Sequence, residues 1–149
     1  MSTYNIPEIV QQLRQVRDQW REQQNRTDQS HREFPSRDAI AHAVDALKGA
    51  LYPLRLGPPD LRHAGEDFYV GHTLDTALQA LQAQALTELQ YRQRGEGQPA
   101  HEIAAQAQQA VLSFARNLPS LRRLLDTDVL AAFQGDPAAR SVDEVVLSY

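Results

Sequence analysis

Apolar residues along this 149-residue chain recur at intervals of three and four residues, and this spacing limits the possible folds more than any other feature. Such intervals place apolar side chains on one face of an α-helix, whereas a half-buried strand needs alternation at every second residue. Glycine is sparse, and most of the eight prolines lie at the edges of the periodic segments. The pattern therefore predicts an all-α fold, a bundle of about five to six helices with one long central helix.

The first predicted helix begins at Pro7, because proline suits the first helical position. Its apolar stripe consists of Ile6, Ile9, Val10, Leu13, Val16 and Trp20. Residues 21–33 are almost wholly polar, which indicates a loop or a frayed end. We therefore separate a polar N-terminal helix or arm over residues 1–33 from a helical domain over residues 34–149. The first helix is either a mobile arm or an assembly element, and the sequence favours neither.

Within residues 34–149, Ser36 is expected to cap a helix that Pro53 limits, and residues 54–60 are expected to form an irregular connection. The buried side of that helix is predicted to contain Ile40, Ala43, Val44, Leu47 and Leu51. The longest helix is expected over residues 67–94. At about 1.5 Å per residue it would reach roughly 40 Å, enough for part of it to pack against another subunit.

Two further helices are expected on either side of Pro119. The first begins near Pro99 and ends at Asn117-Leu118-Pro119, because proline disfavours helical geometry in the residue before it. The second spans Pro119 to Gln134. A last helix is expected after Ser141.

The stretch from Asp126 to Ser141 is predicted to end one helix and begin the next. Gly135 is expected to close the first helix in the left-handed conformation, and Pro137 prevents simple continuation. Ser141 and Glu144 have the spacing of a capping box. Asp136 therefore lies at a corner between two helices, with its carboxylate directed outward. An Asp before Pro at a helix end is most often a turn former.

Composition argues against several classes of function. A net charge of −4 argues against a general nucleic-acid binder, and the absence of cysteine excludes disulfides and cysteine-ligated metals. No apolar run approaches the roughly 20 residues of a membrane span, and residues 1–12 show no secretory signal, so the cytoplasm is the expected location. There is no nucleophile elbow or phosphate-binding glycine loop, and autonomous catalysis is not expected.

Histidines and carboxylates are the side chains of this sequence that could act as metal ligands or catalytic groups. The five histidines lack the spacings of di-iron or zinc motifs, and no metal site is expected. Gly71 inside a helix indicates close approach of another helix. His72 is then interpreted as a packed side chain that Asp75, one turn later, orients. Asp126 and Asp128 are interpreted as helix surface or as partners of the neighbouring arginines, Arg122 and Arg123.

Several strings together resemble the N-terminal helical domain of bacterial serine O-acetyltransferases. They are Phe34-Pro35-Ser36-Arg37, Leu51-Tyr52-Pro53, Tyr69-Val70-Gly71-His72-Thr73-Leu74-Asp75, and Asp126-Thr127-Asp128 through Ser141 with Val142-Asp143-Glu144-Val145-Val146. The resemblance covers most of the chain, from about Phe34 to Tyr149, and none of its motifs is a catalytic signature. In that family a left-handed β-helix of hexapeptide repeats follows and carries the catalytic histidine and the acetyl-CoA groove. No hexapeptide periodicity is present here, so the resemblance implies an isolated N-terminal domain.

The resemblance also implies a function. The family transfers an acetyl group from acetyl-CoA to serine, giving O-acetyl-L-serine for cysteine biosynthesis. Asp136 would bind the serine ammonium as half of a pocket, while Gly71, His72 and Asp75 would have structural or interface roles. No catalytic residue and no bound cofactor are expected in this chain, since acetyl-CoA is a co-substrate of the full-length enzyme.

The expected partners are further copies of the chain, in a dimer or a higher oligomer, and the β-helix catalytic domain. Cysteine synthase would dock through the missing C-terminal part, and neither nucleic acid nor a membrane is expected. The alternative is a stand-alone helical protein–protein interaction module without catalysis.

Overall fold

The computed structural model describes residues 5–23, 34–93 and 96–148. Every regular element in these ranges is a helix, and the all-α prediction is confirmed for them. The chain divides into two compact units, residues 1–33 and residues 34–149. Each unit is described by itself below.

The first unit contains α1 (Ile6–Gln23). The helix continues to Gln23, so the expected loop does not begin at Arg21; the rest of that predicted loop, residues 24–33, lies outside the described residues. Arg21 Nη1 lies 3.1 Å from Asp18 Oδ1, an i,i+3 ion pair that supports the last turn. No residue of α1 is buried.

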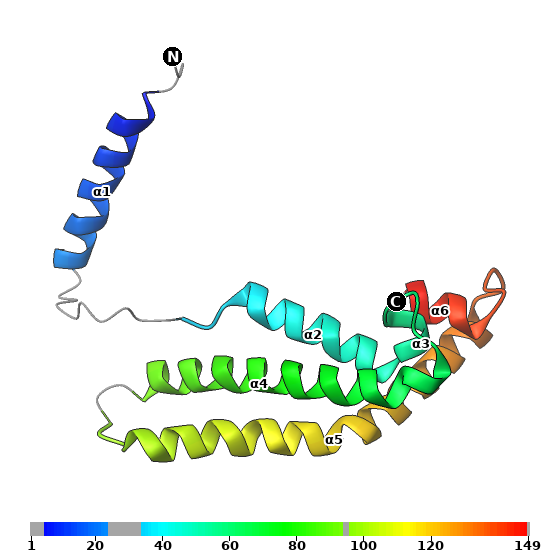
Figure 1. The fold of residues 1–149 in the computed structure, drawn as a ribbon. Helices are drawn as coiled ribbons and strands as arrows, with labels where there is room; N and C mark the ends of the chain where they lie inside the picture. Colours follow the sequence, from blue (N-terminus) through cyan, green and yellow to red (C-terminus); the bar gives the residue numbers. More distant parts are fainter. Residues whose placement is uncertain (1–4, 24–33, 94–95, 149) are drawn as a thin grey trace. The chain divides into compact units, whose positions relative to one another are not determined.

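Three helices form the body of the second unit: α2 (Arg37–Leu51), α4 (Glu66–Arg92) and α5 (Ala100–Gly135). In Figure 1 they lie side by side, with α4 between α2 and α5, as the contacts between these helices also show. One buried residue from each helix meets in the core: Leu47, Ala77 and Leu118. Ala77 is only 2% exposed, and its small side chain allows both neighbouring helices to approach α4.

The start of α2 follows the prediction. Ser36 Oγ accepts a 3.2 Å hydrogen bond from Ala39 N, so Ser36 caps the helix. Its own N–H donates to Gln84 Oε1 at 2.6 Å, which ties the cap to α4. The predicted buried side is partly wrong, because Ile40 and Val44 are 37% and 42% exposed.

The connection after α2 is more regular than expected. Pro53 does not simply end a helix; it opens the short helix α3 (Pro53–Leu56), where its missing N–H is not needed. A 3₁₀ turn, η1 (His63–Gly65), then leads into α4. The prediction of irregular structure therefore fails for residues 54–56.

The two helices predicted on either side of Pro119 are one helix, α5, and α5 rather than α4 is the longest in the described ranges. Proline removes one backbone hydrogen bond and bends a helix, and Figure 1 shows α5 changing direction along its length. The break is prevented by packing, since Leu118, directly before the proline, is 5% exposed in the core. None of the described helices is long and apolar enough to span a bilayer.

Candidate functional site

The corner after α5 is built by Asp136 itself. Its N–H donates to Ala132 O at 3.1 Å, which ends the helix. Its Oδ1 accepts a 2.9 Å bond from Ala138 N, and its carbonyl accepts a 3.1 Å bond from Ala139 N. This is the local turn that Asp side chains favour. Gly135 ends α5 without a positive φ, so the predicted left-handed closure is wrong.

The last helix, α6 (Val142–Ser148), begins at the predicted cap. Ser141 Oγ accepts a 3.2 Å bond from Glu144 N, as expected for a capping box. In a capping box the Glu side chain accepts a bond from the N–H of the capping Ser. Here Glu144 Oε2 instead accepts from the N–H of Arg140, one residue earlier, at 2.9 Å. Val145, 4% exposed, anchors α6 against the rest of the unit.

Asp136 is exposed, as the sequence predicted. One carboxylate oxygen, Oδ1, is used by the turn. Within the described ranges no partner is found for the other oxygen, Oδ2. Asp136 can therefore accept a hydrogen bond from a ligand without giving up the turn.

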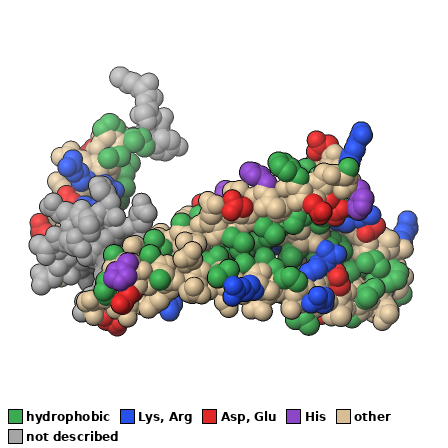
Figure 2. Space-filling model, turned by 60° about the horizontal axis from the view of Figure 1, so that its bottom comes forward, with side chains coloured by type: hydrophobic (Ala, Val, Ile, Leu, Met, Phe, Trp, Pro, Cys, Tyr) green, Lys and Arg blue, Asp and Glu red, His purple; other side chains and the backbone are tan. Residues whose placement is uncertain are grey.

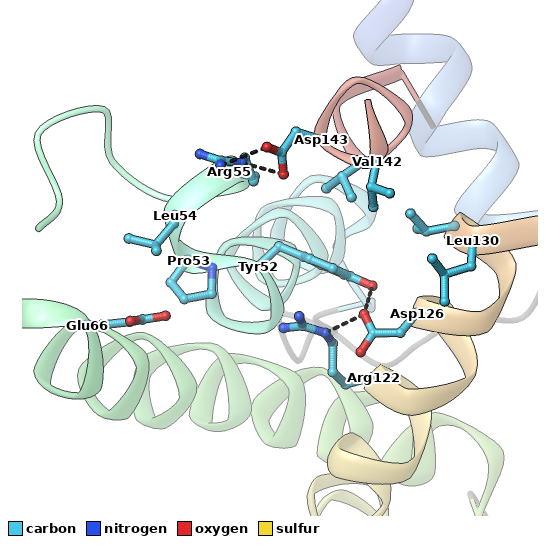
Figure 3. Close-up of a pocket in the computed structure, with 12 residues that line it drawn as sticks. Tyr52, Pro53, Leu54, Arg55, Glu66, Arg122, Asp126, Leu130, Val142 and Asp143 are labelled. Carbon is cyan, nitrogen blue, oxygen red and sulfur yellow. Dashed lines mark hydrogen bonds and ion pairs between the residues drawn. The ribbon is translucent and has the colours of Figure 1, made fainter. Parts of the chain in front are cut away.

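A second cluster joins α2 to α5. Tyr52 Oη donates to Asp126 Oδ1 at 2.9 Å, and Arg122 Nε donates to the same oxygen at 2.8 Å. Arg122 Nη1 also donates to Leu51 O, and the guanidinium carbon lies 4.0 Å from the centroid of the Tyr52 ring. Figure 3 shows these side chains pointing toward one another. Asp126 is thus a partner of Arg122, which confirms the interpretation from the sequence.

The cluster shifts two pKa values in opposite directions. The hydrogen bond from Arg122 lowers the pKa of Asp126 below its ordinary value, and the bond from Tyr52 acts in the same direction. Burial raises the pKa of Tyr52, and its bond to the Asp126 carboxylate raises it further. Tyr52 therefore stays protonated as a donor, and Asp126 stays ionised as an acceptor.

A hollow of about 490 Å³ lies beside this cluster, between α3, α5 and α6. At its rim, Arg55 Nε and Nη2 contact the two oxygens of Asp143 at 2.7 and 2.8 Å, a bidentate pair that joins α3 to α6 (Figure 3). The bond from Arg55 lowers the pKa of Asp143. The remaining charged lining residue, Glu66, lies 2.8 Å from His63 Nδ1.

Gly71, His72 and Asp75 lie on an exposed face of α4. A Cβ at Gly71 would meet no atom within 4 Å, so no other described helix approaches there. The close approach occurs instead at Gly49, where a Cβ would overlap the Tyr69 hydroxyl and lie 3.2 Å from Leu56 O. Among the described residues, the prediction of a packed His72 oriented by Asp75 is therefore wrong.

The side chains on this face have local partners. The His72 and Phe68 rings are stacked, with their centroids 6.4 Å apart, and Phe68 is itself 83% exposed. Asp75 accepts a 3.0 Å bond from Gln79 rather than from His72. In the described part of the chain, no three His, Asp or Glu side chains are placed to share a metal ion.

Comparison with known proteins adds one relative. A protein of Synechococcus elongatus named "Serine acetyltransferase, plasmid" is 36% identical to this chain over 119 residues. The resemblance to serine acetyltransferases is confirmed. The match covers 78% of this chain, and the chain spans 37% of the length of that acetyltransferase. No protein-family model matches.

The corner at Asp136 and the hollow differ in what they can offer to a ligand such as serine. Each described charged side chain that lines the hollow already has a hydrogen-bond partner: Arg55 bonds to Asp143, Arg122 to Asp126, and Glu66 to His63. Asp136 does not line it. The sequence predicted the exposed position of Asp136 and the Arg122–Asp126 pair, whose i,i+4 spacing is a local signal. It missed Tyr52, Arg55 and Asp143, because no local spacing relates residues that meet only in the fold.

Proposed function

We propose that this chain is the helical part of a cytoplasmic serine O-acetyltransferase, where it joins chains and completes the serine site. The similarity to a serine acetyltransferase over 119 residues carries the proposal. In this role the chain has no acetyltransferase activity by itself. The rest of the enzyme binds acetyl-CoA, forms O-acetyl-L-serine for cysteine biosynthesis, and provides any docking site for cysteine synthase.

The proposed ligand for the serine ammonium is Asp136. The Asp136 residue is exposed, and its Oδ2 accepts no bond within the described ranges. A carboxylate forms short, charge-assisted hydrogen bonds with an ammonium group. An exposed ion pair of this kind contributes at most about 1 kcal/mol. Asp136 is therefore half of a pocket, and the general base that deprotonates the serine hydroxyl lies in the rest of the enzyme.

The test is a kinetic comparison in a full-length serine acetyltransferase that carries this region. Replacing Asp136 should raise KM for serine far more than KM for acetyl-CoA. Equal effects on the two constants would remove the proposed role. The purified chain itself, mixed with serine and acetyl-CoA, should release no CoA.

The proposed contacts between chains include the exposed face of α4. No described residue of this chain packs over Gly71, although a glycine in mid-helix costs up to about 1 kcal/mol relative to alanine. One turn earlier, Phe68 exposes most of its ring. A helix of a second copy that packs over Gly71 would explain both features, because glycine allows helices to approach closely.

Exposed apolar residues elsewhere in the second unit support self-association. Five lie on α5: Leu112, Phe114, Leu121, Leu124 and Leu130. Figure 2 shows hydrophobic side chains gathered over one face of residues 34–149. Apolar patches of this kind commonly mark surfaces that bind another protein chain.

A further inference from the structure

α1 exposes an apolar stripe that no described part of its own unit covers. The members of the stripe are 46–61% exposed: Ile6, Ile9, Val10, Leu13, Val16 and Trp20. Most helices in proteins, including ones as long as this 18-residue helix, owe their stability mainly to packing of an apolar face. The stripe therefore requires a partner surface.

Five of these residues follow a strict heptad. Starting at Ile6, the intervals are three, four, three and four residues. Positions a are then Ile6, Leu13 and Trp20, and positions d are Ile9 and Val16. An apolar residue every 3.5 positions is the pattern of a coiled coil, whereas a helix on a globular surface shows a wider stripe with a 3.6-residue period. The heptad favours another helix as the partner.

The charges of α1 indicate which helix this is. Three arginines balance three carboxylates: Arg14, Arg17 and Arg21 against Glu8, Asp18 and Glu22. Helices that bind anionic bilayers are rich in Lys and Arg on the polar face, and α1 has no such excess. Two copies of a helix with zero net charge meet without net repulsion. The flanking e and g positions, which include Gln12 and Arg17, place no like-charged pair across a parallel seam.

We propose that α1 pairs with the α1 of a second copy of this chain in a short coiled coil, with Trp20 in its core. The described helix contains between two and three heptads, which is short for a stable coiled coil. Pairing is therefore strengthened by contacts elsewhere that hold two chains together and raise the effective concentration of α1. In this sense the inference rests on the self-association proposed above and adds a specific element to it.

Trp20, the single tryptophan of the chain, reports directly on this pairing. The experiment dilutes the full chain in steps and records both its mass by light scattering and the wavelength of maximal tryptophan emission. Emission should move to shorter wavelength as the mass rises, because pairing removes the indole from water. Leu13→Glu should raise the concentration needed for half of this shift by more than about tenfold, since it places a charge in the seam.

The matched control is Gln11→Glu, which introduces the same charge at an f position on the opposite face and should leave the shift unchanged. Leu13→Ala keeps helix propensity high and should still weaken the pairing by about tenfold. If α1 unfolds in Leu13→Glu, the concentration needed for half of the emission shift in Leu13→Ala, compared with that of the parent chain, still tests the pairing.

Four results would overturn the pairing. A mass that rises without a spectral shift would exclude α1 pairing and leave the other contacts between chains intact. A chain that stays monomeric would exclude both. An emission shift that appears only with vesicles of phosphatidylcholine and phosphatidylglycerol would identify lipid as the partner. An equal loss in Gln11→Glu would show that the heptad face is not the contact.

Discussion

Tyr52 donates a 2.9 Å hydrogen bond to Asp126 although 74 positions separate the two residues in the sequence. The bond joins the end of α2 to α5, and Arg122, on the preceding turn of α5, donates a second bond to the same Asp126 oxygen. Pro53 and α3 follow directly, so the cluster fixes the point where the chain leaves α2. It therefore positions the wall of the hollow that α3, α5 and α6 share.

Tyr52→Phe should reduce the free energy of unfolding by about 0.5–1.5 kcal/mol, the usual net value of one hydrogen bond. The ring remains, so its contact with the Arg122 guanidinium should persist. Urea unfolding followed by circular dichroism measures the change. Stability equal to that of the parent chain would mean that the bond to Asp126 adds nothing.

Stability should also fall in acid through Asp126. Its pKa is lowered in the folded chain, so its contribution is fully present above the unfolded value near 3.8 and is lost as pH falls through the folded value. The Arg122 and Asp126 side chains are 40% and 46% exposed, and solvent screening limits the effect to below about 1 kcal/mol. Urea unfolding of the parent chain and of Asp126→Asn should therefore differ at neutral pH and converge in acid. A constant difference at all pH values would contradict this account.

Gly49→Ala and Gly71→Ala should change stability in opposite directions. At Gly49 the new methyl group meets the Tyr69 hydroxyl and Leu56 O, so the chain should lose about 1 kcal/mol or more. At Gly71 nothing lies within 4 Å, and alanine should stabilise the helix of a monomeric chain by about 0.5–1 kcal/mol.

The same pair also tests the proposed α4 interface. Gly71→Ala should weaken association of chains while it stabilises the monomer. At the other glycine, Tyr69→Phe removes the hydroxyl that the new methyl group meets, and should recover part of the stability lost in Gly49→Ala. Analytical ultracentrifugation separates association from stability. Unchanged association in Gly71→Ala would argue against a helix packed over this residue.

Leu118→Ala should cost about 2–4 kcal/mol, because it empties a core position that α5 shares with α2 and α4. Leu124→Ala, six residues later on the same helix and 63% exposed, is the matched control and should change stability by less than about 0.5 kcal/mol. Thermal unfolding measures both. Similar losses in the two variants would mean that Leu118 is not a core residue.

Asp136 serves both the turn and the proposed serine site, and two substitutions separate these roles. Asn keeps an oxygen that can accept from Ala138 N but removes the charge, whereas Ala removes both. In the full-length enzyme, Asp136→Asn should raise KM for serine by about fivefold, the effect of losing an ion pair that contributes about 1 kcal/mol. Asp128→Asn, an exposed carboxylate on α5, should not. A normal serine KM in Asp136→Asn together with a raised one in Asp136→Ala would assign Asp136 to the turn only.

Local patterns in the sequence were sufficient for much of this fold. Apolar residues at intervals of three and four determined helices, and short-range bonds at Ser36 and Ser141 determined where two of them begin. The outward position of Asp136 also follows from its neighbours, because the turn closes through its own side chain. Each of these features depends on groups within a few residues of one another.

Tertiary structure decided the rest. A local rule placed a break at Pro119, but burial of Leu118 against two other helices keeps α5 continuous, because packing outweighs the loss of one backbone hydrogen bond. Tyr52 finds Asp126 and Arg55 finds Asp143 only after folding, since 74 and 88 positions separate them. Intervals in a sequence describe one helix at a time, whereas these contacts depend on how helices are placed against one another.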